Sequence, residues 1–151
     1  MLLFVCTGNI CRSPMAEFLL RRRLGPDSRW TVGSAGLAAI PGLPASEAAI
    51  AVMDEIGIDL RRHRSRLLDG ELIDAASLVV VMTAEQQEQL KAMAAGSLEK
   101  TFLLTSFNAS GNRKDIQDPI GLSLHAYRAV RDEIEAALPG LVDFMNGLEL
   151  E

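Results

Sequence analysis

A cysteine and an arginine in a C-x5-R spacing stand near the start of the chain, in the stretch VCTGNICRSP at residues 5–14. The thiolate of Cys6 is a nucleophile, and the planar guanidinium of Arg12 can bind two phosphate oxygens at once. The residues between them form a tight turn that leads into an expected helix, so their backbone N–H groups can converge on an anion. The spacing predicts a phosphate-binding loop with a sulfur nucleophile at its floor.

The surroundings of Cys6 favour its ionised form. The positive end of the helix, the loop N–H groups and Arg12 all stabilise a thiolate relative to a thiol. Ser13 can cap the helix and offer its hydroxyl to the sulfur, while Gly8 and Asn9 tolerate the left-handed backbone that such a loop needs. We expect attack on phosphorus to give a cysteinyl phosphate that water later hydrolyses. The predicted phosphate-binding residues are Thr7, Gly8, Asn9, Ile10, Cys11, Arg12 and Ser13.

Two other interpretations of the cysteines carry less weight. A lone buried cysteine is usually a small apolar residue. The C-x4-C pair resembles half of a zinc site, but the chain offers only His63 and His125 as further soft ligands, and a cysteine placed after a buried strand is atypical of structural zinc. We therefore expect no metal and no cofactor.

Apolar runs alternate with helical patterns along the chain. We expect strands at 2–5, 30–35, 78–82 and 101–104, and helices at 14–24, 45–56, directly after Thr83, and at 122–138. Pro14 suits the first position of its helix, and Pro139-Gly140 is expected to kink or break the last helix. This order predicts an α/β fold with a parallel sheet covered on both faces. The cysteine loop then follows the first strand, and ligands of such folds bind at the carboxyl ends of strands.

Size and charge limit the classes of partner. The 151 residues are most simply one domain, residues 1–151. With 15 Lys and Arg against 20 Asp and Glu, the net charge of −5 argues against a nucleic-acid or anionic-membrane partner. The sequence has no recognisable secretion signal or membrane span. Two cysteines in a chain without a secretion signal indicate the reducing cytoplasm. We also expect a monomer.

Several further motifs accompany the loop: GSAG at 33–36, the segment GID…HRSR at 57–66, VVMT at 80–83 and DP at 118–119. Together they resemble the low-molecular-weight protein-tyrosine phosphatases, whose loop pattern is V-C-x-G-N-x-C-R-S-P, along nearly the whole chain. The resemblance implies a flavodoxin-like three-layer fold around a four-stranded parallel sheet. It also implies metal-free hydrolysis of phosphate monoesters on proteins, with inorganic phosphate or a similar oxyanion held in the loop.

The resemblance also implies individual roles. The matched positions are Cys6 as nucleophile, Arg12 as phosphate clamp, Asn9 as the residue that holds the loop in shape, Ser13 as support for the thiolate, and Ser34 and His63 as partners of that asparagine. From the sequence alone, an ordinary surface histidine beside Arg62 and Arg64 is an equally good interpretation of His63.

A leaving oxygen departs more easily if it is protonated, so the reaction needs a general acid. Asp118 matches the family's acid, and Pro119 keeps the residue before it extended. Spacing alone leaves Asp115 nearly as good a candidate. Only the resemblance selects Asp118.

Substrate preference depends on residues that depart from the family pattern. Many members carry an aromatic residue at the position of Ile40 and a Tyr-Tyr pair at Ile120-Gly121, where rings stack on a phosphotyrosine. Here the expected wall is aliphatic and consists of Ile10, Ile40, Leu43 and Ile120. DPIGLSLHAY, which contains Tyr127, is more similar to the bacterial branch that includes protein-arginine phosphatases, but that branch tends to carry threonine at the position of Ile10. We predict a phosphotyrosine substrate, with phosphoarginine as the alternative.

Further alternatives stay open. A non-catalytic module that reads phosphoproteins would keep the same loop. The related arsenate reductases need two later cysteines, and none follows Cys11. Cys11 itself is either a partner for a protective disulfide with Cys6 or a small buried residue of the loop.

Overall fold

A four-stranded parallel sheet in the order β2-β1-β3-β4 lies at the centre of the computed structural model, which describes residues 1–111 and 114–149. The strands are β1 (Leu2–Cys6), β2 (Val32–Gly36), β3 (Leu78–Val81) and β4 (Thr101–Leu103). Strand β1 pairs with β2 from Leu2↔Val32 to Cys6↔Gly36, and with β3 from Leu2↔Leu78 onward. The predicted α/β fold with a parallel sheet is confirmed.

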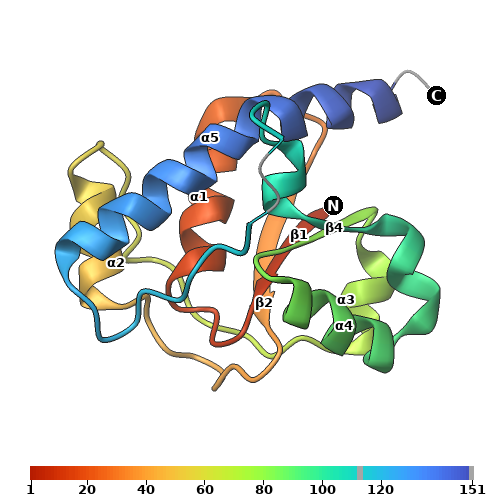
Figure 1. The fold of residues 1–151 in the computed structure, drawn as a ribbon, viewed down its shortest axis with the longest axis horizontal. Coiled ribbons are helices and arrows are strands. Elements are labelled where there is room, and N and C mark those ends of the chain that lie inside the picture. The colour runs from red at the N-terminus through yellow and green to blue at the C-terminus, as the bar shows by residue number, and fades with distance from the viewer. Residues whose placement is uncertain (112–113, 150–151) are drawn as a thin grey trace.

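Helices cover both faces of this sheet (Figure 1). They are α1 (Arg12–Leu24), α2 (Glu47–Asp54), α3 (Gly70–Ala75), α4 (Ala84–Met93) and α5 (Leu124–Glu149), with short 3-10 helices η1 (Ala95–Lys100) and η2 (Leu104–Phe107). Side chains of β1 alternate between the faces: Leu2 and Phe4 pack in the core shared with α1, α2 and α5, and Leu3 and Val5 in the core shared with α3 and α4. Burial on both faces explains why the strand is apolar throughout.

The last helix continues where the sequence predicted a kink or break. Helix α5 includes Pro139 and remains helical to Glu149. Leu141 and Met145, beyond the proline, are fully buried, so apolar burial outweighs the missing N–H of Pro139. Gly140 lies against the carbonyl of Phe107, where a side chain would collide. The Pro-Gly pair is therefore a close packing point between α5 and η2.

The start of α1 also differs from the prediction. Its N-cap residue is Cys11, and no side chain caps it. Ser13 and Pro14 are then the second and third helical residues, and Pro14 still sits in the first turn, where N–H groups lack intrahelical acceptors. The predicted cap role of Ser13 is wrong, because its hydroxyl is directed to the loop described below.

Helix α3 was not predicted from the sequence. It has six residues, begins at the cap Asp69, whose carboxylate accepts from Leu72 N at 2.9 Å, and buries only Ile73. A single buried position gives no helical periodicity to detect.

The end of α2 is tied to α5 by Glu55, which accepts from Arg128 Nη2 at 2.7 Å and from Arg131 Nη1 at 2.9 Å. The hydrogen bond from Arg128, more than any other contact, lowers the pKa of Glu55 from 4.5 to about 2. A lowered pKa in the folded state means that the contribution of this ion pair to stability is present above about pH 4.5 and disappears as the pH falls toward 2.

We expect Glu55→Gln to reduce the free energy of unfolding slightly at neutral pH and to lose this effect in acid. Urea unfolding across this pH range measures it. Glu133→Gln, on an exposed part of α5, is the control, and an equal effect of Glu55→Gln at all pH values would contradict the ion-pair account.

Candidate active site

The loop of residues 7–11 connects the end of β1 to the start of α1, at the carboxyl end of the sheet. Main-chain bonds fix its first residues, because Cys6 O accepts from Leu37 N and Thr7 O from Ala38 N, both at 2.9 Å. A Cβ added to Gly36 would lie 2.6 Å from Thr7 O. The second glycine of GSAG is therefore required for the loop to pack on β2.

Asn9 holds the curled shape of the loop. Its φ of 58° is left-handed, the only such value at a non-glycine residue in the described chain. Asn9 Nδ2 donates to Ser13 Oγ at 2.8 Å and Ser34 Oγ at 2.9 Å, while Oδ1 accepts from Arg66 N at 2.9 Å. The Asn9 carbonyl lies 2.6 Å from His63 Nε2. These bonds offset the strain of a left-handed residue.

The structure corrects the sequence interpretation of two residues, His63 and Gly8. His63 is buried, with 6% of its surface exposed, so it is not the ordinary surface histidine of the alternative interpretation. Gly8 does not have a left-handed backbone, so Asn9 alone makes that turn.

The sulfur of Cys6 lies 2.9 Å from Ser13 Oγ and 3.3 Å from Asn9 N. Since Ser13 Oγ already accepts from Asn9 Nδ2, its own hydrogen can be donated to the sulfur, where it stabilises a thiolate. In the described chain, the N–H groups of Gly8, Ile10 and Cys11 have no hydrogen-bond acceptor. They are available to a bound anion.

Arg12 is buried, with 4% of its surface exposed, and is anchored by a bond from Nη1 to Ile116 O at 3.0 Å. Its Nη2 lies 3.7 Å from Asp118 Oδ2. Nε is buried and has no partner in the described chain. An unpaired buried donor costs about 1–3 kcal/mol, a cost that an oxyanion accepting from this nitrogen would remove.

A cavity of about 130 Å³ brings the predicted groups together. Its lining residues are Cys6, Thr7, Gly8, Asn9, Ile10, Cys11, Arg12, Asp118 and Ile120. Of the predicted aliphatic wall, Ile10 and Ile120 line this cavity. Ile40 and Leu43 do not; they are 67% and 38% exposed.

The two candidate acids have different surroundings. Asp118 lines the cavity with its side chain 47% exposed, and its Oδ1 accepts from Ile120 N at 3.1 Å. Asp115 Oδ1 accepts from Ala84 N at 2.9 Å, at the start of α4, and does not line the cavity. Geometry therefore separates two aspartates that spacing could not.

Cys11 is buried and belongs to a separate hydrogen-bonded group. Its sulfur lies 3.3 Å from Ser46 Oγ and 3.4 Å from the Tyr127 hydroxyl. Burial is the main cause that raises the pKa of Cys11, and burial also raises the pKa of Tyr127 to about 12. Cys11 and Tyr127 carry their protons at neutral pH, and no disulfide joins Cys6 and Cys11 in this structure.

Three supporting residues were missed by the sequence analysis. Arg66 binds Asn9 through its backbone, Glu17 Oε1 accepts from Ser34 Oγ at 2.6 Å, and Gln86 Nε2 donates to Thr7 Oγ1 at 3.1 Å. The i,i+4 spacing of Glu17 and Arg21 was a detectable signal for a paired carboxylate. Nothing in the sequence indicates the reach of Gln86 to Thr7.

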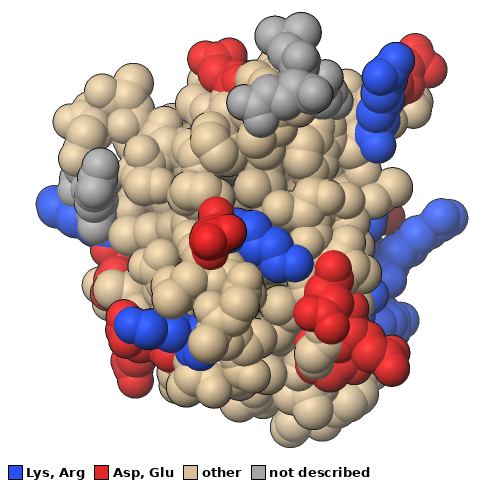
Figure 2. Space-filling model, turned by 90° about the vertical axis from the view of Figure 1, so that its right-hand side faces the viewer, with Lys and Arg blue, Asp and Glu red and all other residues tan. Residues whose placement is uncertain are grey.

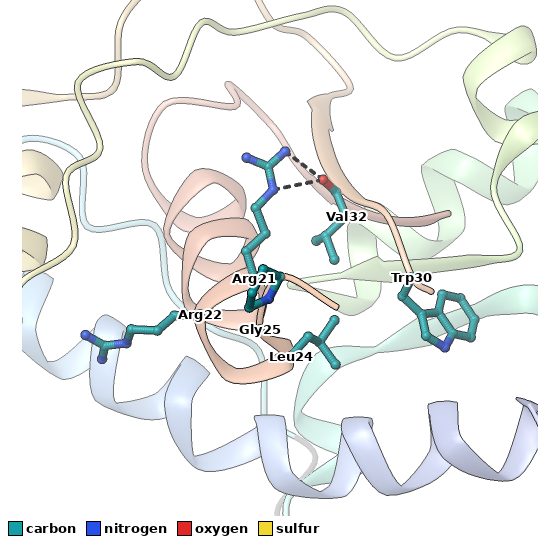
Figure 3. Close-up of a pocket in the computed structure, with 7 residues that line it drawn as sticks. Arg21, Arg22, Leu24, Gly25, Trp30 and Val32 are labelled. Carbon is teal, nitrogen blue, oxygen red and sulfur yellow. Dashed lines mark hydrogen bonds between the residues drawn. The ribbon is translucent and has the colours of Figure 1, made fainter. Parts of the chain in front are cut away.

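A groove elsewhere on the molecule lacks such chemistry. It has about 370 Å³ and lies between the end of α1 and the start of β2, lined by Arg21, Arg22, Leu24, Gly25, Pro26, Trp30 and Val32 (Figure 3). It contains no thiol, hydroxyl or carboxylate side chain.

Among the described residues, no three metal-ligating side chains converge. On the face shown in Figure 2, charged side chains of both signs are scattered among uncharged ones.

Comparison with known proteins agrees with this geometry. The family model "Low molecular weight phosphotyrosine protein phosphatase" matches residues 1–149. The chain belongs to this family. A protein-arginine-phosphatase of Geobacillus stearothermophilus is 42% identical over 142 residues, which cover 94% of this chain and 93% of the relative.

Solved structures of family members share the fold. The YwlE arginine phosphatase from Geobacillus stearothermophilus superposes with a TM-score of 0.89 at 40% identity, covering 99% of this chain and 94% of that one. The tyrosine phosphatase Wzb from Escherichia coli K30, in complex with sulphate, gives 0.85 at 35% identity, covering 95% and 96%. The fold that the sequence resemblance implied is confirmed. No described helix in this phosphatase is long and apolar enough to span a membrane.

Asn9→Ala removes three side-chain hydrogen bonds and places alanine in a left-handed conformation. We expect the free energy of unfolding to fall by about 1–3 kcal/mol and phosphate inhibition to weaken roughly ten-fold or more, a loss of about 1.4 kcal/mol. Urea unfolding and competitive inhibition by phosphate measure the two effects. Asn146→Ala, exposed on α5, is the control. Unchanged phosphate inhibition would contradict the role given to Asn9.

Proposed function

We propose that this chain hydrolyses phosphotyrosine on proteins through a cysteinyl-phosphate intermediate. The observation that carries the proposal is the single cavity lined by Cys6, Arg12 and Asp118. In the first step the Cys6 thiolate attacks phosphorus, and the phosphoryl oxygens accept from the loop N–H groups and from Arg12. The P–O bond to tyrosine breaks, and Asp118 gives its proton to the departing phenolate oxygen.

The second step returns the enzyme to its starting state. Asp118, now ionised, takes a proton from a water molecule whose oxygen attacks phosphorus. The S–P bond breaks, sulfur leaves as a thiolate, and inorganic phosphate is released. Ser13 donates to the sulfur and stabilises it as a thiolate when it attacks and when it leaves. Asn9, Ser34 and His63 act as positioning residues, because their side chains hold the shape of the loop. One chain supplies every group, so the reaction needs only a monomer, and a free thiolate suits a reducing cytoplasm.

The preference for phosphotyrosine rests on the apolar side chains at the cavity and on the family. Ile10 and Ile120 present aliphatic surface against which a phenyl ring can be buried. The similarity to arginine phosphatases favours phosphoarginine as the second candidate. Ile10, however, offers no hydroxyl to a guanidino phosphate.

Two peptides that are identical except for phosphotyrosine or phosphoarginine test this preference. We expect kcat/KM to be at least about ten-fold higher for phosphotyrosine, equivalent to about 1.4 kcal/mol in transition-state binding. The reverse ratio would instead support an arginine phosphatase. Tight phosphopeptide binding without any turnover would indicate the non-catalytic module.

A further inference from the structure

A second groove, of about 400 Å³, lies behind the phosphate loop between α1, the edge strand β2 and residues 62–66. It is lined by Met1, Glu17, Phe18, Arg21, Val32, Gly33, Ser34, Arg62, His63, Arg64 and Arg66. None of these residues lines the Cys6 cavity. We infer that this groove is a second binding site, separate from the catalytic loop, for a doubly charged oxyanion of the phosphate class.

The charge of the groove is opposite to that of the chain. Four arginines face a single carboxylate there, in a protein whose net charge is −5. That carboxylate, on Glu17, is already occupied by Ser34 Oγ and Arg21 Nη2, each at 2.6 Å. Such a local excess of positive charge concentrates anions.

Three of the guanidinium groups are anchored by carbonyls with donors left over. Arg66 Nε donates to Ser34 O at 2.8 Å, and Arg64 Nη1 to His63 O at 2.7 Å. Arg21 bonds Val32 O through Nε and Nη2, and Figure 3 shows its third nitrogen pointing away from that carbonyl. No acceptor in the described chain binds Arg21 Nη1, Arg64 Nη2 or the terminal nitrogens of Arg66. An anion meets donors that are already oriented, so less side-chain freedom is lost on binding.

Of the four arginines, Arg62 has the fewest interactions with the rest of the described chain. It makes no hydrogen bond or ion pair with the described residues. Asp59, close to Arg62 in the chain, is held by Arg61 at 3.1 Å. The Arg62 side chain is therefore free to close on a ligand.

The sequence leaves room for this arrangement at Gly33. A Cβ on that residue would lie 2.6 Å from Arg66 Nη2, so the guanidinium lies directly over the glycine. The first glycine of GSAG and the last arginine of HRSR thus form one wall of the groove. Ser34 and His63, in the same groove, each bond Asn9, so a bound anion would lie next to the supports of the catalytic loop.

Titration with inorganic phosphate, followed by backbone amide NMR shifts, tests the inference. We expect two saturating groups of shifts with separate affinities, one in residues 7–13 and one in residues 33–34 and 62–66. Arg62→Ala should weaken the second at least about five-fold, and Arg62→Glu should remove it. Arg23→Ala, which removes an exposed charge of α1 outside the groove, should change neither.

A second titration, with a phosphoserine peptide, distinguishes a protein-bound phosphoryl group from free phosphate as the ligand of the groove. The ligand that saturates the shifts of the groove residues at the lower concentration is the one that the groove prefers. Sodium chloride at matched ionic strength controls for screening. Groove signals that drift without saturation, or that Arg62→Glu leaves unchanged, would overturn the second site. Loss of the shifts in residues 7–13 alone would instead count against the proposed catalytic loop.

Discussion

Cys6→Ser is expected to reduce turnover of an aryl phosphate by roughly 10⁴-fold or more, because a serine hydroxyl stays protonated at neutral pH and is a much weaker nucleophile and poorer leaving group than a thiolate. Ser13 Oγ, at 2.9 Å from the sulfur, can donate to an existing thiolate, but a neutral hydroxyl is too weak a base to deprotonate a serine at position 6. Steady-state assays in the presence of a chelator measure the loss.

The control for Cys6→Ser is phosphate binding. The loop N–H groups and Arg12 remain in the variant, so phosphate should still bind within a few-fold of its wild-type affinity, a few-fold being under about 1.4 kcal/mol. A variant that binds phosphate without turnover shows that only the nucleophile was lost. Substantial turnover by Cys6→Ser would exclude Cys6 as the attacking group.

Asp118→Asn is expected to have the second largest effect, and the size should depend on the leaving group. An amide cannot donate the proton, so we expect kcat/KM to fall by about 10²–10⁴-fold for phosphotyrosine peptides. For activated aryl phosphates, whose phenolates leave without protonation, the rate of this first step should fall much less. Rates for a series of aryl phosphates of graded leaving-group acidity measure the difference.

Asp115→Asn is the matched comparison for Asp118→Asn. Asp115 Oδ1 accepts a hydrogen bond from Ala84 N at the start of α4. Its substitution should therefore lower the free energy of unfolding without changing how the rate depends on the leaving group. An equal loss for all leaving groups in Asp118→Asn, or the graded pattern in Asp115→Asn, would contradict the assignment of the acid.

The sheet and the loop were predictable because local signals determine them. The apolar run at β1, the Gly-Asn turn and the start of α1 lie next to one another in the chain, so their joint geometry follows from short-range rules. Helix α5 was not predictable to its end, since Leu141 and Met145, beyond Pro139, are buried in a core formed with segments distant in the sequence. At this point tertiary packing overrides the low helix propensity of Pro139 and Gly140.

The same contrast holds within the candidate site. Spacing alone suggested Cys6 and Arg12, but the choice of Asp118 over Asp115 needed either the family resemblance or the structure. Ser13 was assigned two roles, a helix cap and a donor to the thiolate. Its hydroxyl contacts Cys6 and Asn9 and does not cap the helix. Arg66 and Ile40 illustrate long-range placement, one brought to the loop and the other left outside the cavity.

The account depends most on a covalent bond between Cys6 and phosphorus. The direct measurement is rapid acid quenching of Asp118→Asn with an activated aryl phosphate, followed by peptide mass spectrometry, since loss of the base should slow hydrolysis of the intermediate. The account predicts one phosphoryl group on the peptide that contains Cys6, absent in the double variant with Cys6→Ala. Turnover with no phosphorylated Cys6 peptide at any quench time would contradict it.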